Sequence, residues 1–445
     1  PRLRPQQFYD LVIEVALIRP GPIQGGSVHP YLRRHDGHQD ATMPHESMRP
    51  ALGKTLGVPL FQEQMMQLAI DCAGFAPDEA DRLRQAMSAK RAPERIEELR
   101  QRLLDGMAER GIGPAVAEDI YAKILAFSNY GFPESHAISF AYLVYASAWL
   151  KRYYPAAFTA ALLRNQPMGF YAPHSLINDA RRHGVTVRGV DVNASDALAT
   201  LEESGPAGQT GPVIRLGLSA VRNLGTAAAE RVAAGRPYRD LEDFATRTRL
   251  PAAALEALAT AGAFGCFGLS RRAALWAAGA AASLREGQLP GTATGMTAPP
   301  LPAMTPAEET LADLWATSTY GTHPVAHIRP ALDARQVLTA EAVKSGSADD
   351  GAYVAVAGLV THRQRPSTAR GVVFLSLEDE TGMVNVICLP PVWERHQPAA
   401  TVAPALVIWG RVERTGGAVN LVADTLRPLR VAASTTGAVA SRDFR

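Results

Sequence analysis

The sequence predicts a multidomain fold in which a helical N-terminal region and a set of helical hairpins precede an all-β C-terminal domain. Three observations support this prediction. Apolar residues recur at helical spacing up to about residue 285, a Pro- and Gly-rich stretch follows, and from residue 351 apolar residues alternate with a period of two. A chain of 445 residues leaves room for several domains.

The composition narrows the class of protein. Hydrophobic residues make up 47% of the chain and charged residues 20%, which excludes wholesale disorder and fibrous repeats. No apolar run approaches the roughly 18 to 20 residues that a membrane span needs. Cys72, Cys266 and Cys388 lie far apart without a CxxC pair, which favours a reducing, cytoplasmic setting. A net charge of +2 means that nucleic-acid affinity must come from local clusters.

Residues 1–165 are predicted to be mostly helical. In residues 62–75 apolar side chains recur at i, i+3, i+4 and i+7, which marks one face of an amphipathic helix. The run from Ser135 to the residue before Pro155 is apolar on nearly every side. We therefore expect a buried central helix with Ser135 as its N-cap.

Shorter elements follow. Residues 166–215 read as a connecting α/β segment, with a helix that ends at Gly184 and a strand after it. Residues 216–285 contain two helix–turn–helix patterns, which predict tandem helix-hairpin-helix motifs. Residues 286–350 are predicted to form a linker and connector, and residues 431–445 a tail.

Residues 351–430 carry five β-rich runs separated by turn residues, with a short helical patch between the third and fourth runs. This order is the one expected of a five-stranded OB barrel.

A basic helix is the first candidate site. Leu83 marks its buried face, and Arg84, Ser88 and Arg91 fall on one flank at i, i+4 and i+7, with Lys90 nearby. Guanidinium groups beside a hydroxyl suit a triphosphate or a nucleic-acid backbone. The alternative is a solvated basic surface.

Two further segments could bind phosphate. Ser135 and His136 are expected at a helix N-terminus, where N–H groups favour an anion; the alternative is a capping serine and a structural histidine. Arg19, Arg33 and Arg34 are expected in a basic loop that faces a nucleic-acid backbone, although such loops are common.

The first hairpin pattern contains Arg222 and the turn Asn223-Leu224-Gly225. Such hairpins present backbone N–H groups to a phosphate independently of sequence. Asn223 replaces the usual first glycine, and asparagine tolerates positive φ best among other residues. A segment around Gly262 resembles a degenerate second copy; the alternative is a plain αα-hairpin with a C-cap glycine.

The first connection of the barrel is basic and polar, with three arginines that could hold a single strand: Arg363, Arg365 and Arg370. Phe374 and Trp409 are candidates for base stacking. The alternative is that both belong to the barrel core, and we favour this reading for Phe374.

No candidate reaction centre is recognisable in the sequence. Two-metal phosphoryl transfer needs closely set carboxylates on a rigid strand, and the acidic residues 240–243 lie at a helix start instead. There is no Walker A loop. We therefore predict no catalytic residue and no metal ligand here. The chain starts at Pro1 without an initiator Met, so we expect it to continue from a larger protein.

Several motifs, taken in order, closely resemble the C-family bacterial DNA polymerase III alpha subunit, and most closely its error-prone, damage-inducible branch. Pro133-Glu134 marks that branch, since replicative subunits typically have Asn-Lys there. The other motifs are RPGP (19–22), LGVPLFQEQ (56–64), AGFAPDEADRLRQAM (73–87), YGFPESHA (130–137), AWLKRYYPAAF (148–158), NQPMGFY (165–171) and LEDETG (377–382).

This resemblance implies helical fingers, tandem helix-hairpin-helix motifs and an OB domain, with the palm aspartates that bind Mg²⁺ upstream of Pro1. It implies that Arg84 faces the incoming dNTP, and that Gln85 stands where the family has a second arginine. The implied function is translesion synthesis on primer-template DNA, with accessory mutagenesis proteins giving access to the sliding clamp.

Two alternatives stay open. A replicative alpha subunit would be favoured by a clamp-binding peptide, but the best match, residues 288–291, lacks the terminal aromatic residue. A non-catalytic DNA-binding protein of hairpin and OB modules is the alternative from another class.

Overall fold

The computed structural model describes residues 3–18, 28–87, 92–127, 132–169, 171–203, 211–284, 292, 294–366, 369–415, 417–430 and 442–444. Backbone contacts divide the chain into two compact units, residues 1–149 with 416–418, and residues 150–415 with 419–445. Within the described ranges, no helix is both long and apolar enough to cross a membrane.

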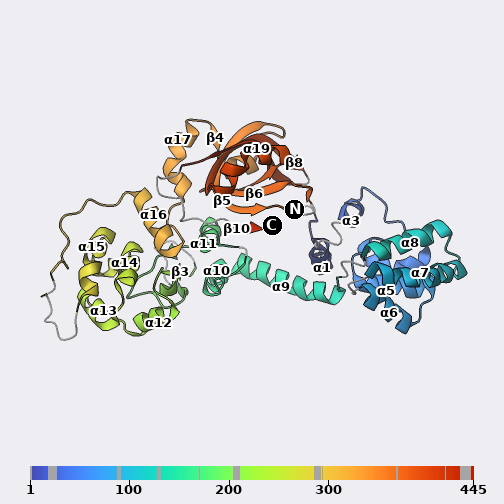
Figure 1. Cartoon of the computed structure of the whole chain (residues 1–445), viewed down its shortest axis with the longest axis horizontal. Coiled ribbons are helices and arrows are strands. Elements are labelled where there is room, and N and C mark those ends of the chain that lie inside the picture. Colours follow the sequence, from blue (N-terminus) through green and yellow to red (C-terminus); the bar gives the residue numbers. More distant parts are fainter. Residues whose placement is uncertain are drawn as a thin grey trace. The chain divides into compact units, whose positions relative to one another are not determined.

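The first unit is helical (Figure 1). One core holds the bundle of α5–α8 together, with Met65, Leu83 and Ile120 fully buried. A second core joins α1 and α3 to the start of α9 around Val12 and Phe61. The helices are α1 (Phe8–Leu17), α3 (Val28–His35), α4 (Arg49–Leu52), α5 (Gln62–Ala73), α6 (Pro77–Met87), α7 (Ala92–Glu109), α8 (Pro114–Phe127) and α9 (Glu134–Tyr153).

The prediction for α9 is wrong in two respects. The helix begins at Glu134, so Ser135 lies in its first turn and is not the N-cap. Only Ala137 and Ala141 are buried, whereas Tyr142 is 64% exposed and most other large apolar side chains of α9 are also exposed. Apolar residues on every face make burial of a helix favourable, but among the described residues only a narrow strip of α9 is covered.

The second unit begins with helices that pack on a small sheet. Strand order is β1–β3–β2, with β1 parallel and β2 antiparallel to β3. Helical hairpins follow around a core that includes Leu218, Phe244 and Leu255. The elements are α10 (Pro155–Arg164), α11 (Pro173–Arg182), β1 (Val187–Arg188), β2 (Thr200–Glu202), β3 (Val213–Arg215), η3 (Leu218–Ala220), α12 (Thr226–Ala234), α13 (Leu241–Thr248), α14 (Ala252–Thr260), η4 (Gly265–Phe267) and α15 (Arg271–Ala282).

The predicted barrel is confirmed. Its strands run in the order β5–β6–β7–β9–β8, and β8 pairs back onto β5 to close it. Helix α19 (Pro390–Val402) stands between the third and fourth strands, as expected. A Cβ on Gly410 would lie 2.2 Å from the carbonyl oxygen of Val422, so this close approach between strands requires glycine. The strands are β5 (Tyr353–Gln364), β6 (Val373–Glu378), β7 (Met383–Cys388), β8 (Ala405–Thr415) and β9 (Ala418–Pro428).

Residues between the hairpins and the barrel form α16 (Pro306–Thr317), η5 (Pro324–Ile328), α17 (Arg329–Asp333), β4 (Val337–Leu338) and α18 (Ala340–Ser345). Strand β4 adds to β5 in parallel, and so does β10 (Arg442–Phe444) at the other end of β5.

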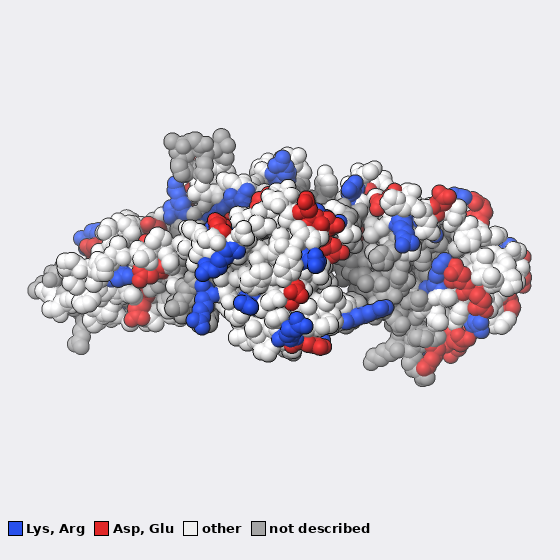
Figure 2. Space-filling view, turned by 90° about the horizontal axis from the view of Figure 1, so that it is seen from above, with Lys and Arg blue, Asp and Glu red and all other residues white. Residues whose placement is uncertain are grey.

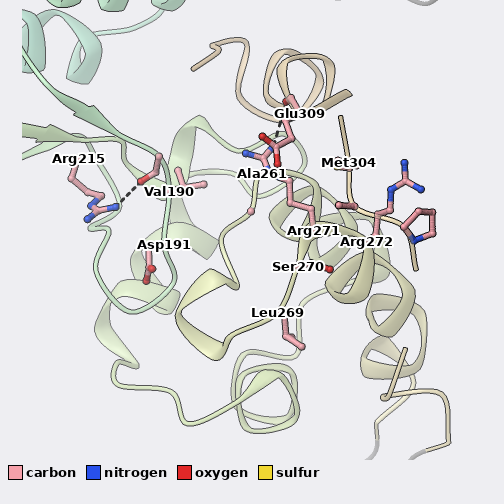
Figure 3. A pocket seen from close by; sticks show the side chains of 14 residues that line it. Val190, Asp191, Arg215, Ala261, Leu269, Ser270, Arg271, Arg272, Met304 and Glu309 are labelled. Carbon is pink, nitrogen blue, oxygen red and sulfur yellow. Dashed lines mark hydrogen bonds between the residues drawn. The ribbon is translucent and has the colours of Figure 1, made fainter. Parts of the chain in front are cut away.

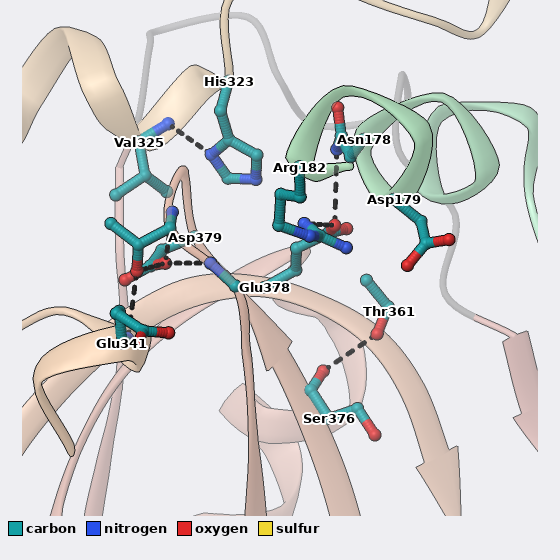
Figure 4. Close-up of polar contacts among 12 residues, drawn as sticks. Asn178, Asp179, Arg182, His323, Val325, Glu341, Thr361, Ser376, Glu378 and Asp379 are labelled. Atoms are coloured by element: carbon teal, nitrogen blue, oxygen red, sulfur yellow. Dashed lines mark hydrogen bonds and ion pairs between the residues drawn. The ribbon is translucent and has the colours of Figure 1, made fainter. Parts of the chain in front are cut away.

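A buried carboxylate joins α11 to the barrel (Figure 4). Glu378 at the end of β6 is fully buried and accepts hydrogen bonds from Arg182 at 3.0 Å and Asn178 at 3.3 Å. Burial raises the pKa of Glu378. Because both donors belong to α11, this carboxylate fixes the connecting segment against the end of the barrel.

Candidate nucleic-acid interface

The basic flank of α6 is partly neutralised. Arg84 Nε lies 2.7 Å from Asp81 Oδ1, and the Gln85 amide donates to the other oxygen of Asp81 at 2.7 Å. Both hydrogen bonds lower the pKa of Asp81. Arg84 and Gln85 are exposed, and Leu83 and Met87 are buried as predicted. The other three predicted members of this cluster lie outside the described residues: Ser88, Lys90 and Arg91.

The N-terminus of α9 already has an anionic partner. The Glu134 N–H donates to Glu63 Oε2 at 2.8 Å, so a protein carboxylate occupies the place where a phosphate was expected. Ser135 and His136 are exposed in this first turn. The ring of His136 packs edge-on against Phe132, with centroids 5.3 Å apart, as a structural histidine would.

The structure nevertheless brings these two predicted segments together. Gln62 Nε2 donates to the Arg84 carbonyl at 3.4 Å, and the Gln62 N–H donates to the Phe132 carbonyl at 3.0 Å. The first turn of α5 therefore bridges the end of α6 and the start of α9. Sequence reasoning missed Gln62, because it reads only as one polar residue of an amphipathic helix.

The prediction of a basic loop is wrong for Arg33 and Arg34, because both lie in helix α3, where Arg33 is exposed. Arg34 donates to the Leu56 carbonyl at 2.6 Å, which gives it a structural role. Arg19 lies outside the described residues.

The hairpin turn has the predicted geometry. Asn223 and Gly225 both adopt positive φ, at 63° and 68°. Gly225 is the N-cap of α12 and supplies no side-chain cap, so the first-turn N–H groups of this helix are open to a ligand. Arg222 is exposed and its guanidinium lies 5.0 Å from the ring centroid of Trp315. The element before the turn is a short 3-10 turn, Leu218–Ala220, not the α-helix that we expected.

The predicted second hairpin lies around Gly262, where α14 and α15 pack closely on each other. Gly262 has φ 77° and directly follows Ala261, the C-cap of α14, so it is the helix-terminal glycine of an αα-hairpin, as in the alternative reading. The turn between α13 and α14 is at Arg249, which also has positive φ (50°). Asn223 Nδ2 approaches the Ala253 carbonyl at 3.5 Å, so the two turns lie next to each other.

A cavity of about 420 Å³ opens beside α15 (Figure 3). Three arginines line it, but each has an acidic partner. Arg215 lies 2.7 Å from Glu202, Arg271 2.7 Å from Asp313, and Arg272 2.9 Å from Glu308. The cavity therefore offers little free positive charge to a ligand.

One arginine that was predicted in the first connection of the barrel lies instead in strand β5 and has a structural role. Arg363 is buried, and its guanidinium donates to the carbonyls of Ala400 at 2.9 Å and Ala403 at 2.5 Å, at the end of α19. Its burial contradicts the predicted contact between Arg363 and DNA. Arg365 and Arg370 are exposed. Phe374 and Trp409 are both half-buried, so neither the core nor the exposed reading holds completely.

Figure 2 shows one face of the molecule, on which acidic side chains are frequent over the helical body that carries α5–α8 and acidic and basic side chains are interspersed over the central part. In the described ranges, no three His, Cys, Asp or Glu side chains come together in a way that could hold a metal ion.

Three family models match the chain. They are the bacterial DNA polymerase III alpha subunit finger domain over residues 1–111, a helix-hairpin-helix motif over 184–274, and an OB-fold nucleic acid binding domain over 354–429. Among solved structures, an asparaginyl-tRNA synthetase from Pyrococcus horikoshii is similar over only 21% of this chain and 22% of its own, with 22% identity and a TM-score of 0.18.

Curated proteins named error-prone DNA polymerase are similar along the whole chain. Those of Mycolicibacterium paratuberculosis and Mycobacterium tuberculosis are 56% identical over 451 residues, covering 100% of this chain and 40% of each relative. That of Nocardia farcinica is 54% identical over 459 residues, covering 100% and 39%. The chain thus spans about 40% of the length of these relatives and matches their C-terminal portion.

Proposed function

Because the chain is homologous over its whole length to a C-terminal portion of the error-prone DNA polymerases, we propose that it is the fingers-to-OB part of such an enzyme. The domains would be fingers (1–165), a connecting segment (166–215), tandem hairpins (216–285), a linker and connector (286–350), the OB-fold (351–430) and a tail (431–445). The complete enzyme would extend primers across damaged template in the cytoplasm, with accessory mutagenesis proteins and, through them, the sliding clamp as partners.

Within that enzyme, this chain would hold DNA and the incoming dNTP. Mg²⁺ would supply the Lewis acid that phosphoryl transfer needs. The described residues do not fit such a site, because no three of their His, Cys, Asp or Glu side chains lie close enough together to hold a metal ion. We therefore assign no bond-making step to this chain. Purified alone, it should bind primer-template DNA and incorporate no nucleotide; Mg²⁺-dependent primer extension by the chain alone would contradict this assignment.

One observation carries the DNA-binding part of the proposal. The turn at Asn223 and Gly225 opens the first turn of α12 to solvent without a side-chain cap, and Arg222 stands beside it. Amide groups at a helix start, reinforced by an exposed guanidinium, suit a phosphate of the DNA backbone.

Gly225→Ala should weaken duplex binding. Gly225 combines φ 68° with ψ 156°, a region that residues other than glycine rarely occupy, so alanine would shift the turn and move the amides away. We expect about a tenfold rise in the Kd for a primer-template duplex, measured by fluorescence anisotropy. Gly268→Ala is the control, because Gly268 also has positive φ (72°) but lies outside the turn. Equal effects of both variants would contradict the assignment.

Arg222→Gln should change the salt dependence of binding. Loss of one phosphate contact lowers the slope of log Kd against log salt by about 1. The control is Arg239→Gln, since Arg239 is exposed and sits in a weak ion pair with Asp243 at 3.6 Å. An unchanged slope for Arg222→Gln would remove this residue from the interface.

Arg84→Ala should weaken binding of the incoming nucleotide. In the complete polymerase we expect a rise in KM for dNTP that exceeds any loss of DNA affinity, because Arg84 is exposed at the end of α6 beside the start of α9. Steady-state single-nucleotide incorporation measures this. Arg82→Ala, an exposed arginine of the same helix, is the control. An unchanged KM would support the alternative that Arg84 belongs to a solvated basic surface.

A further inference from the structure

The first hairpin turn is bonded to a helix that lies outside the helix-hairpin-helix match. That match ends at residue 274, whereas α16 begins at Pro306. The Leu224 N–H donates to the Val221 carbonyl at 3.3 Å, which closes a β-turn around Arg222 and the residue after it. The Arg222 N–H points out of this turn and donates to the Ala316 carbonyl of α16 at 2.7 Å.

The backbone bond between Arg222 and Ala316 is buried. Ala316 is 1% exposed and lies in the last turn of α16, where the carbonyl groups have no partner within the helix. The Arg222 N–H satisfies one of these carbonyls away from water. The end of α16 therefore fixes the backbone of the hairpin turn.

The neighbouring residue of α16 holds the side chain of the same arginine. Trp315 is 39% exposed, and the guanidinium of Arg222 lies over its ring, 5.0 Å from the centroid. Tryptophan is the aromatic residue that attracts a cation most strongly. A guanidinium that rests on a ring keeps the N–H groups at its edge available for a phosphate.

Arg222 differs from the three arginines that line the cavity beside α15. Each of those has a carboxylate partner at 2.7 to 2.9 Å. Within the part of the chain that the structure describes, Arg222 contacts an indole ring in place of an acid. Its charge is therefore held in position without being neutralised.

We propose that α16 belongs to the DNA-binding surface of the hairpin, and that Trp315 is a positioning residue for Arg222. The indole holds the guanidinium beside the first turn of α12, where it binds a phosphate of duplex DNA. A long side chain that is already ordered loses less conformational entropy when it binds. This inference rests on the proposed function and adds to it a residue from the segment that was expected to be only a connector.

The test measures binding of a fluorescein-labelled primer-template duplex to the whole 445-residue chain by anisotropy. Trp315→Ala should raise the Kd about threefold, the effect of losing an exposed cation–π contact. The slope of log Kd against log salt should fall towards that of Arg222→Gln, because the same phosphate contact is weakened. In an Arg222→Gln background, Trp315→Ala should have no further effect, which a double-mutant cycle measures.

Two substitutions separate stacking from packing. Trp315→Phe keeps an aromatic ring under the guanidinium and should retain most of the affinity, whereas Trp315→Leu fills similar space without a π-face and should bind as weakly as Trp315→Ala. This pair carries the test even if alanine lowers the urea midpoint of the chain. The control is Trp276→Ala, since Trp276 is an exposed tryptophan of α15 (53%), and its Kd should be unchanged.

The outcomes separate this inference from the proposed function. If the effects of Trp315→Ala and Arg222→Gln add independently, or if the leucine variant binds as well as the phenylalanine variant, Trp315 does not position Arg222. The proposed function stands in both cases, because the unmodified chain still binds the duplex. If the unmodified chain does not bind it, the proposed function fails and this inference fails with it.

Discussion

Asp379→Ala is expected to lower the free energy of unfolding of the second unit by about 3–5 kcal/mol, the cost of breaking a buried charged network. Asp379 is 1% exposed, and its Oδ1 accepts from both the N–H and the hydroxyl of Thr381 and from the Gly382 N–H. Its Oδ2 accepts from the Ala340 N–H at 2.7 Å and from Arg329 at 3.3 Å. Alanine would leave these donors without their partner.

Two measurements check this expectation. The urea midpoint should fall, and hydrogen exchange should rise in peptides that contain α18 and the β6–β7 turn. Asp333→Ala is the control, because Asp333 is 61% exposed and lies 3.8 Å from the same Arg329, where an ion pair is worth at most about 1 kcal/mol. Similar losses in the two variants would show that Asp379 is not the centre of this network.

The strands of the barrel could be predicted from the sequence, whereas the contacts of Asp379 that attach residues 329–340 to the barrel could not. Alternation along a strand is a local property, so the sequence alone predicted five strands and the intervening helix. The LEDETG segment was recognised only as a family motif. Its role depends on Arg329 and Ala340, about 50 and 40 positions away in the chain, and no local pattern reports such partners.

The same distinction separates the geometry of the hairpin turn, which was predicted correctly, from the environment of Arg363, which was not. Asn223 and Gly225 were predicted because a tight turn constrains φ within a few residues, and both have positive φ. The burial of Arg363 was not predicted, because it depends on carbonyl groups at the end of α19, 37 to 40 positions farther along the chain. A basic residue in a polar loop has the same local pattern whether it faces solvent or caps a helix.

Helix α9 shows the limit for apolar patterns. Its composition predicted burial, yet Tyr142, Tyr145 and Trp149 are exposed. Hydrophobicity measures the free energy that burial would release, and the fold decides whether a partner is present.

Gln62 shows the opposite limit, because a polar residue that looks like helix surface in the sequence makes two structural hydrogen bonds. Its two hydrogen bonds join α6 to the start of α9, but its polarity alone indicates only a helix surface.

The second large effect concerns acid stability. His323 is 7% exposed, and burial, reinforced by the nearby His174, Arg182 and Arg329, lowers its pKa from 6.5 to about 3. Between pH 6.5 and about pH 3, His323 is protonated in the unfolded chain and neutral in the folded chain. The contribution of His323 to stability is therefore complete above pH 6.5 and declines as the pH falls towards 3, by up to about 1.4 kcal/mol per pH unit, or roughly 2 kcal/mol at pH 5.

His323→Asn should remove this dependence. The asparagine oxygen can still accept the Val325 N–H, which now donates to His323 Nδ1 at 3.2 Å, but it does not titrate. Urea unfolding at pH 7.5 and pH 5 should show a smaller acid-induced loss than in the unmodified chain. Glu378→Gln is the opposite control. The raised pKa of Glu378 makes the folded state take up a proton on acidification, which offsets part of the His323 loss, so its removal should deepen the acid sensitivity. Equal pH dependence in all three proteins would show that neither buried group governs acid stability.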